Sequence, residues 1–325
     1  MKAAQLVAPR KWQMIEEEKP QASDGNMLVR MERVALCGTD KPFFCGLSSS
    51  YPLEPGATGH EGLGVVESCP SGKFQEGDRV ILWGFDRGLF QEYVLAPDVL
   101  TPDQGCVLLP RDLELEVVLM SQLLGTVIHC FFKLGNLINQ KVVVLGQGSV
   151  GQLFNATLRN LGAKYIIGVD PLSHKLEVSA KMGATHTIHP AERDVEEAVR
   201  EITGGEMADV VVEAIGLEKT LNLCSSLLRR NGTLIYFGVP DKDNPEGILQ
   251  VNFREIFTKE LHIVTTVGPN PQQDYTTALD WITQGRLDVR PIISHILPFD
   301  EIQQAFEMAF DRPAEHKSLK VILKF

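Results

Sequence analysis

The chain has 325 residues, of which 44% are hydrophobic and 22% charged, and its formal net charge is −11. This length predicts about two domains at roughly 150 residues each, and the composition is ordinary for a globular protein that can bury a core. The acidic excess is not offset by any stretch dense in Lys or Arg, which excludes nucleic acid and anionic membranes as partners.

The N-terminal segment, residues 1–7, predicts a first β-strand. It lacks the long apolar stretch and the small-residue cleavage site of a signal peptide. The longest apolar run, Val117 to Phe132, contains polar residues and is shorter than the roughly 20 apolar residues that span a bilayer. Six cysteines without CxxC spacing fit reduced thiols better than a disulfide framework. We therefore expect a cytoplasmic protein.

Two short motifs place candidate metal ligands 23 residues apart. The first is CGTD at Cys37–Asp40, and the second is GHE at Gly59–Glu61. Thiolate, imidazole and carboxylate groups are all zinc ligands. No second cysteine lies two to four residues from Cys37, which argues against a closed structural site and favours a catalytic zinc with an open position. The alternative is that Cys37 and His60 are ordinary core residues.

The middle of the chain shows the order strand, glycine turn, helix. The β-branched run Lys141–Leu145 is followed by a glycine-rich turn and by a helical pattern over 152–161. A second predicted strand, Tyr165–Val169, ends at Asp170, 24 residues after the first glycine. This order and spacing match the dinucleotide-binding fingerprint. The turn residues expected to bind the cofactor are Gly146, Gln147, Gly148, Ser149, Val150 and Gly151.

Each part of this fingerprint has a physical role. Gly146 permits the tight turn, Gly148 lets the backbone approach the pyrophosphate, and Gly151 allows close packing of strand and helix. The helix N-terminus presents free N–H groups to the phosphates. Asp170 would accept hydrogen bonds from both adenosine ribose hydroxyls and repel the 2′-phosphate of NADP, so NAD is favoured. The alternative is a glycine turn that serves only packing.

Alternating strands and helices continue to residue 268. The further predicted strands are 186–188, 209–213, 233–237 and 261–267, and the predicted helices between them end near 182, 202 and 230. A turn is predicted at Asn231 and Gly232. Six strands with crossing helices predict an α/β, doubly wound parallel sheet over residues 123–268.

The two flanks, residues 1–122 and 269–325, are expected to form the second domain together. The first flank has short alternating runs rich in Gly and Pro, which predicts an irregular, mainly β domain. The second adds helices near 274–283 and 299–310 and a closing strand, Leu319–Leu323. The ligand cleft is expected between the domains, at the carboxyl ends of the parallel strands.

The order of these motifs resembles the medium-chain dehydrogenase/reductase family, specifically its zinc-dependent alcohol, polyol and sugar dehydrogenase branch. The resemblance covers nearly the whole chain and implies a Rossmann domain inserted into a GroES-like catalytic domain. It also implies hydride transfer between a secondary alcohol and NAD. The segments that carry it are Cys37–Asp40, Gly59–Val66, Gly77–Val80, Gly146–Gly151 and Lys320–Leu323.

The resemblance assigns the zinc ligands. It implies that Cys37 and His60 bind the catalytic zinc, and that Glu61 either binds the metal directly or exchanges with its water. A further ligand position, 24 residues before Gly146, holds Gln122. The Gln122 amide oxygen either binds the zinc weakly or binds it through a water molecule. Alternatively, the amide only forms a hydrogen bond across the cleft.

The resemblance also implies roles for further residues around this site. Thr39 resembles the hydroxyl that accepts the substrate proton and passes it to the nicotinamide ribose. Many relatives end that relay with a His five residues after the zinc Cys, where this chain has Pro42. Asp40 is expected to accept a hydrogen bond from His60. Lys320 either pairs with a carboxylate of the site or is solvated.

About a dozen residues without a cysteine separate Val80 from the EYV motif at Glu92. Relatives with a structural zinc carry a four-cysteine loop there, so we expect one catalytic zinc per chain and no structural zinc. The ligand set contains Glu61 and Gln122 and no second cysteine. This set resembles that of polyol and sugar dehydrogenases, which implies a polyol, sugar or cyclitol substrate. The aromatic residues that either line the cleft or belong to the core are Phe43, Phe44, Trp83 and Phe85.

Two other functions remain open. The family contains zinc-free, NAD(P)H-dependent quinone or enone reductases, which generally lack the Cys and His that this chain keeps. A nucleotide-binding protein without catalysis is the second alternative. Relatives pair through the edge of the nucleotide-domain sheet, where Leu261–Val267 is the last predicted strand. We therefore expect a homodimer or homotetramer that acts on a small alcohol or carbonyl substrate.

Overall fold

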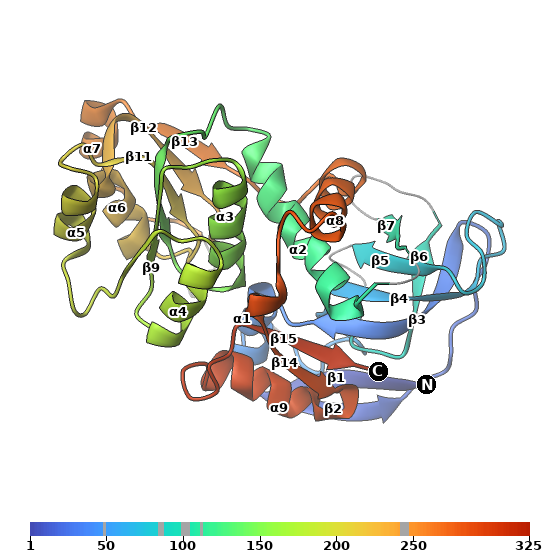
Figure 1. The fold of residues 1–325 in the computed structure, drawn as a ribbon. Coiled ribbons are helices and arrows are strands. Elements are labelled where there is room, and N and C mark those ends of the chain that lie inside the picture. The colour runs from blue at the N-terminus through green and yellow to red at the C-terminus, as the bar shows by residue number, and fades with distance from the viewer. Residues whose placement is uncertain (48–49, 84–87, 99–104, 111–112, 241–246) are drawn as a thin grey trace. The chain divides into compact units, whose positions relative to one another are not determined.

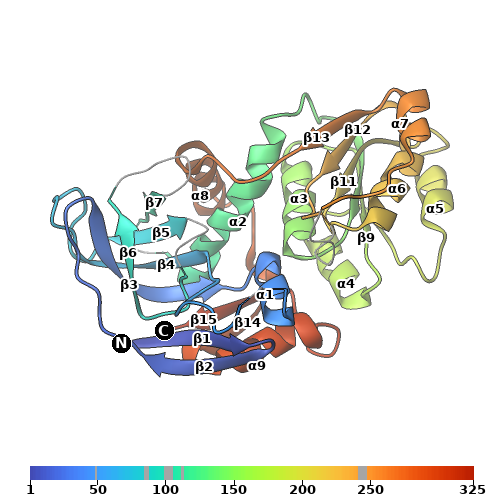
Figure 2. The same ribbon diagram turned by 180° about the vertical axis from the view of Figure 1, so that it is seen from behind.

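The structure is a computed structural model that describes residues 1–47, 50–83, 88–98, 105–110, 113–240 and 247–325. It divides into two compact units. The first comprises Met1–Thr126, Pro269–Gln284 and Ile293–Phe325, and the second comprises Val127–Gly268 and Gly285–Ile292. The ribbon is shown from two opposite sides in Figures 1 and 2. Within the described ranges no helix is both long and apolar enough to cross a membrane.

The second unit contains a parallel sheet of six strands among its described residues, in the order β10-β9-β8-β11-β12-β13. The strands are β8 (Lys141–Leu145), β9 (Tyr165–Val169), β10 (His186–Ile188), β11 (Ala208–Glu213), β12 (Leu228–Tyr236) and β13 (His262–Thr265). The strand order reverses between β8 and β11, as in doubly wound dinucleotide-binding sheets. The predicted six-stranded α/β architecture is confirmed.

Helices cover both faces of this sheet because its strands are apolar on both sides. They are α3 (Ser149–Asn160), α4 (Ser173–Lys181), α5 (Val195–Ile202), α6 (Glu218–Leu227) and α7 (Phe253–Lys259). Helices α3 and α4 lie on one face, and α5 and α6 lie on the other (Figures 1 and 2). Val143, Ile167 and Val211 from the sheet share a buried cluster with Val199 of α5 and Cys224 of α6.

One boundary in this unit differs from the prediction. The helix expected to reach Arg230 ends at Leu227, and β12 starts at Leu228 rather than at Thr233. Asn231, where a turn was predicted, has φ of 57° and lies inside β12, where the pairing with β11 shifts register. Asn tolerates this left-handed conformation better than most residues, so the turn signal marks an irregularity within the strand.

The first unit is mainly β, as predicted. Its larger sheet has the strand order β14-β15-β3-β4-β5-β7, with β6 also paired to β3, and β1 pairs with β2 in a separate sheet. The strands are β1 (Lys2–Ala8), β2 (Lys11–Glu16), β3 (Asn26–Ala35), β4 (Glu61–Ser68), β5 (Arg79–Trp83), β6 (Tyr93–Pro97), β7 (Gly105–Leu108), β14 (Ile293–Pro298) and β15 (Lys320–Lys324). The antiparallel pairing of β15 with β3 joins the C-terminal flank to the N-terminal one.

Helices complete this unit, most of them short. The helices are η1 (Gly38–Asp40), α1 (Lys41–Cys45), α2 (Leu115–Phe131), η2 (Pro271–Tyr275), α8 (Thr276–Thr283), η4 (Phe299–Glu301), α9 (Ile302–Phe306) and η5 (Glu307–Asp311). The longest, α2, continues into the second unit. The helices predicted near 274–283 and 299–310 are therefore present, the second in three short pieces.

Aromatic packing forms the centre of the first unit's core. The ring of Phe306 on α9 lies 4.8 Å from that of Trp12, 5.2 Å from Phe44 and 5.5 Å from Phe90, measured between ring centres. Such pairs add to the free energy of burial beyond their area. Phe44 is thus a core residue, whereas Phe43 is exposed.

The other two candidate cleft aromatics, the Trp83 side chain and Phe85, fall outside the described residues. All six cysteines are free thiols.

Candidate metal and cofactor sites

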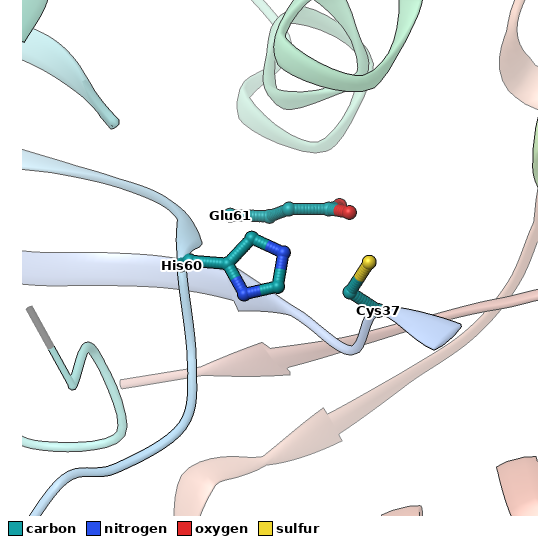
Figure 3. A group of neighbouring side chains, drawn as sticks. All are labelled: Cys37, His60 and Glu61. Atoms are coloured by element: carbon teal, nitrogen blue, oxygen red, sulfur yellow. The ribbon is translucent and has the colours of Figure 1, made fainter. Parts of the chain in front are cut away.

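Strand pairing brings the CGTD and GHE motifs together. Ala35, the last residue of β3, lies opposite Glu61, the first residue of β4. Cys37 follows β3 and His60 precedes β4, so both motifs fall at the same end of this antiparallel pair. The ligand atoms of Cys37, His60 and Glu61 all lie within 4.8 Å of one another. Figure 3 shows the sulfur, the imidazole and the carboxylate converging on one space.

This donor set fits a zinc ion. One sulfur, one nitrogen and one carboxylate oxygen are typical of zinc sites that keep a position open for substrate. His60 and Glu61 are buried, and a buried acidic group is costly unless positive charge offsets it. Burial by itself lowers the pKa of His60, but Cys37, Asp40 and Glu61 outweigh burial and raise it to about 10. The surroundings of His60 therefore favour a cation, a role that a divalent metal can fill.

Asp40 holds the turn that carries Cys37 and Thr39. Its buried carboxylate accepts hydrogen bonds from the backbone N–H of Cys37 at 2.8 Å and from the Thr58 hydroxyl at 2.5 Å. Its Oδ1 lies 3.8 Å from His60 Nδ1, which is longer than a hydrogen bond. The expected hydrogen bond from His60 is therefore not formed, and Asp40 acts on the backbone of the CGTD motif instead.

Thr39 lies beside the ligand cluster. Its hydroxyl oxygen is 3.4 Å from Nε2 of His60. A hydroxyl can both accept and donate a proton, so this position suits the proton relay expected from the sequence.

Lys320 reaches the site through the pairing of β15 with β3. The Leu36 N–H donates to Val321 O at 2.9 Å, and Lys320 Nζ donates to Leu36 O at 2.9 Å. The same ammonium forms a buried ion pair with Oε2 of Glu61. The expected pairing with a site carboxylate is confirmed, and the solvated alternative is wrong.

Sequence reasoning missed Tyr275, a buried residue of η2. Burial raises the pKa of its hydroxyl well above the ordinary value, and Glu61, Gln122 and Cys37 are among the groups that act on it. Gln122 lies on α2 and is also buried. Tyr275 follows Cys37 by 238 residues and belongs to no motif, so no local signal could have placed it here.

The glycine-rich turn joins β8 to α3. Gly146 has φ of 89°, which side chains rarely tolerate. A Cβ added at Gly151 would lie 1.9 Å from the carbonyl oxygen of Gly146, whereas a Cβ at Gly148 would meet nothing within 4 Å. The fold therefore requires glycine at positions 146 and 151. The protein's own packing does not require it at 148.

The side chain of Gln147 points beneath the turn. Its Nε2 donates to Val144 O at 2.8 Å, and its Oε1 accepts from Asn155 Nδ2 at 2.6 Å and from Ser179 Oγ at 2.7 Å. These partners tie the turn to α3 and α4. The side chain of Gln147 is therefore engaged within the protein and does not point to a ligand above the turn.

Asp170 links the end of β9 to the same turn. Its two carboxylate oxygens accept the backbone N–H of Gln147 at 2.8 Å and that of Leu172 at 2.9 Å. Each carboxylate oxygen can accept a further hydrogen bond. Asp170 can therefore brace the turn and still accept hydroxyl groups.

Comparisons with known proteins agree with this fold. Two family profiles match: the alcohol dehydrogenase GroES-like domain over residues 23–110 and zinc-binding dehydrogenase over residues 149–284. An alcohol dehydrogenase from Cupriavidus necator is 27% identical, with 95% of this chain and 94% of the relative covered. An L-threonine 3-dehydrogenase from Caldanaerobacter subterraneus subsp. tengcongensis is 24% identical, with 91% of each chain covered.

Among solved structures, an alcohol dehydrogenase from Thermus sp. ATN1 matches with a TM-score of 0.87 and 25% identity, covering 100% of this chain and 99% of that one. The chain belongs to the medium-chain dehydrogenase/reductase family, with a GroES-like and a Rossmann-type part.

Proposed function

We propose that this protein is a zinc-dependent oxidoreductase that transfers a hydride between a secondary alcohol and NAD. The observation that carries the proposal is the convergence of Cys37, His60 and Glu61 within 4.8 Å in a zinc-binding dehydrogenase. These three residues would hold one zinc ion, with Gln122 as a further ligand and no structural zinc elsewhere. Bound zinc supplies a Lewis acid that lowers the pKa of the alcohol, and bound NAD accepts the hydride.

The chain's own residues orient the substrate and move its proton. The Thr39 hydroxyl would accept the proton of the substrate hydroxyl. Pro42 offers no side-chain acceptor, so the proton leaves through water or another group. Lys320 holds Oε2 of Glu61 in place, and Asp40 holds the turn before α1. Glu61 would either bind the metal directly or exchange with its bound water.

We assign zinc and substrate binding to residues 1–122 and 269–325, and cofactor binding to residues 123–268. Within the second range, the backbone of residues 146–151 and the N-terminus of α3 would bind the pyrophosphate. Asp170 would bind the adenosine ribose. The preferred substrate class is a polyol, sugar or cyclitol, because Glu61 and Gln122 replace a second cysteine at the site.

The purified protein is expected to contain about one zinc per chain and to reduce NAD in the presence of a secondary alcohol. Metal analysis and a substrate panel of polyols, sugars, cyclitols, simple alcohols and L-threonine test this. Metal-free protein that reduces quinones or enones would establish a zinc-free reductase instead. Binding of NAD without turnover of any panel member would support a non-catalytic nucleotide-binding protein.

Asp170→Ser is expected to raise the ratio of NADP-linked to NAD-linked kcat/KM by about 10-fold or more, because a carboxylate hydrogen bond to the ribose and the repulsion of the 2′-phosphate are both lost. Both cofactors should bind more weakly in absolute terms, since the N–H groups of Gln147 and Leu172 lose their acceptor. Steady-state kinetics with each cofactor measure the ratio.

Asp209→Ser is the matched control for this change. Asp209 likewise accepts a backbone N–H, from Lys141 at 2.7 Å, but it lies at the amino ends of β8 and β11. The control should leave the cofactor ratio unchanged. A wild-type protein that already prefers NADP, or an unchanged ratio in Asp170→Ser, would contradict the assignment.

We also propose that a second copy of the chain pairs along β13, which gives a dimer or tetramer. β13 is an edge strand of the six-stranded sheet. Large apolar side chains are exposed on β13, directly after it and on the preceding helix α7: Ile263 (49%), Val267 (87%), Phe253 (66%) and Phe257 (74%). An apolar sheet edge in water promotes association.

Ile263→Lys on β13 should therefore shift the protein towards the monomer, as measured by light scattering after size-exclusion chromatography. Ile296→Lys is the control, because Ile296 is equally exposed (49%) on β14, an edge strand of the other large sheet. A monomeric wild-type protein would contradict the proposed pairing, as would an equal shift in both variants.

A further inference from the structure

The ring of Tyr275 lies directly against α2 at Gly125. A Cβ added at Gly125 would lie 2.3 Å from Cδ1 and 2.8 Å from Cε1 of this ring. Both distances are far below ordinary van der Waals contact, so only glycine at this position leaves room for the ring. Gln122 precedes Gly125 by three residues on the same helix and therefore lies on the same face. The geometry places the Tyr275 side chain over the face of α2 that carries Gln122.

The backbone before Tyr275 is held by two local hydrogen bonds. Asn270 caps η2 by accepting the N–H of Gln272 at 3.2 Å, and its own N–H donates to Asp274 Oδ2 at 2.5 Å. Tyr275 itself is buried. A buried aromatic side chain with an anchored backbone has little freedom, so the position of its hydroxyl is well defined.

The orientation of the Gln122 amide decides whether it can bind a metal. An amide has a donor end, Nε2, and an acceptor end, Oε1, and only the oxygen can bind a cation. Oε1 of Gln122 is buried and accepts no hydrogen bond from the described residues. If a neighbouring group accepts a hydrogen bond from the N–H end of the Gln122 amide, the oxygen end stays available to a metal. Burial raises the pKa of the Tyr275 hydroxyl, and Gln122 lies close enough to act against that rise. No hydrogen bond of ordinary geometry joins these two side chains in the structure.

We propose that Tyr275 is a positioning residue whose hydroxyl accepts an N–H of Gln122 when a metal occupies the site, and thereby directs Oε1 towards the Cys37, His60 and Glu61 cluster. This inference rests on the proposed zinc-dependent function. It assigns Tyr275 a role through Gln122 and no contact with the substrate. It also explains the need for glycine at position 125, since any side chain there would displace the ring that carries the hydroxyl.

Tyr275→Phe tests the proposal because it removes the hydroxyl and keeps the ring over Gly125. The zinc affinity of the loaded protein, measured by competition with a chelator of known affinity, should fall by about 10-fold, as is typical when a group supporting a ligand is lost. Gln122→Ala should lower the affinity at least as much. The double variant should bind zinc no more weakly than Gln122→Ala alone, because Tyr275 acts through Gln122. The visible spectrum of the cobalt-substituted protein should change in the same three variants.

Two further variants sharpen the test. Gly125→Ala keeps the hydroxyl but removes the space for the ring, and should reproduce the loss of affinity. Tyr93→Phe is the control, since Tyr93 lies on β6 and packs with Lys19 rather than with the ligand cluster. It should bind zinc as the wild type does.

Unchanged zinc affinity in Tyr275→Phe, or losses that add in the double variant, would overturn the positioning role while leaving the proposed function intact. Absence of zinc from the wild-type protein would instead contradict the proposed function. The two failures are therefore distinguishable.

Discussion

Cys37→Ser is expected to lose its zinc and to retain at most about a thousandth of the NAD-linked activity, because several kcal/mol of transition-state stabilisation by the metal disappear. A serine hydroxyl stays protonated near neutral pH, whereas a cysteine at a metal site binds as the thiolate. With the sulfur removed, only His60 and Glu61 remain of the three groups within 4.8 Å. Metal analysis and NAD reduction with the best panel substrate measure both losses.

Cys45→Ser is the matched control for this substitution. Cys45 is another partly exposed free thiol of the first unit, at the end of α1, and it lies outside the ligand cluster. The control should keep its zinc and its activity and should unfold near the wild-type temperature, because its thiol is only partly buried. Cys37→Ser should unfold at a lower temperature than the zinc-loaded wild type, because the stabilisation by bound metal is lost. If Cys37→Ser retained zinc and activity, Cys37 would not be a ligand and the zinc-free reductase would be favoured.

Gly148→Ala and Gly151→Ala are expected to impair the protein in different ways. At Gly151 the new Cβ would lie 1.9 Å from a backbone oxygen of Gly146, which cannot move without opening the turn. Overpacking of this kind costs about 1–3 kcal/mol of folding free energy or more. Gly151→Ala should therefore lower the unfolding temperature and, with the turn distorted, abolish NAD binding.

At Gly148 the protein itself leaves space, since no atom lies within 4 Å of an added Cβ. Its φ of −68° is also ordinary for alanine. Stability should stay close to that of the wild type. The methyl group would stand where the pyrophosphate approaches the turn, so NAD should bind about 10-fold more weakly or worse through loss of a charge-assisted hydrogen bond.

Thermal unfolding and NAD titration separate these two effects. Gly135→Ala is the control for Gly148→Ala, because its added Cβ also meets nothing within 4 Å and Gly135 lies outside the turn. Equal NAD affinity in Gly148→Ala and Gly135→Ala would remove the turn from the cofactor site. Wild-type stability in Gly151→Ala would contradict the close packing of the turn against α3.

The nucleotide-binding fold was readable from the sequence because its signals are local. A β-branched run, a glycine turn and an amphipathic segment each specify an element within about ten residues. The predicted strands Lys141–Leu145 and Tyr165–Val169 match β8 and β9 residue for residue. The exception, Asn231, shows the limit: a turn signal can be absorbed by a strand when pairing with its neighbour shifts register.

The first unit was harder to predict because its site is assembled from distant segments. The motifs named Cys37, His60 and Glu61, but only the register of β15 against β3 shows that Lys320 reaches both Leu36 O and Glu61. Register depends on the partner strand, which a single segment does not specify.

The direction of side chains was the other feature that only the tertiary structure could show. Gln147 turns beneath the glycine loop to Asn155 and Ser179. The Tyr275 ring packs against Gly125 on the helix that carries Gln122. Sequence patterns identify the residue types and the order of the elements, because these depend on neighbouring positions along the chain. Which side chains meet depends on how close-packed elements fit in three dimensions, and this placed Lys320 against Glu61 and the Tyr275 ring against α2.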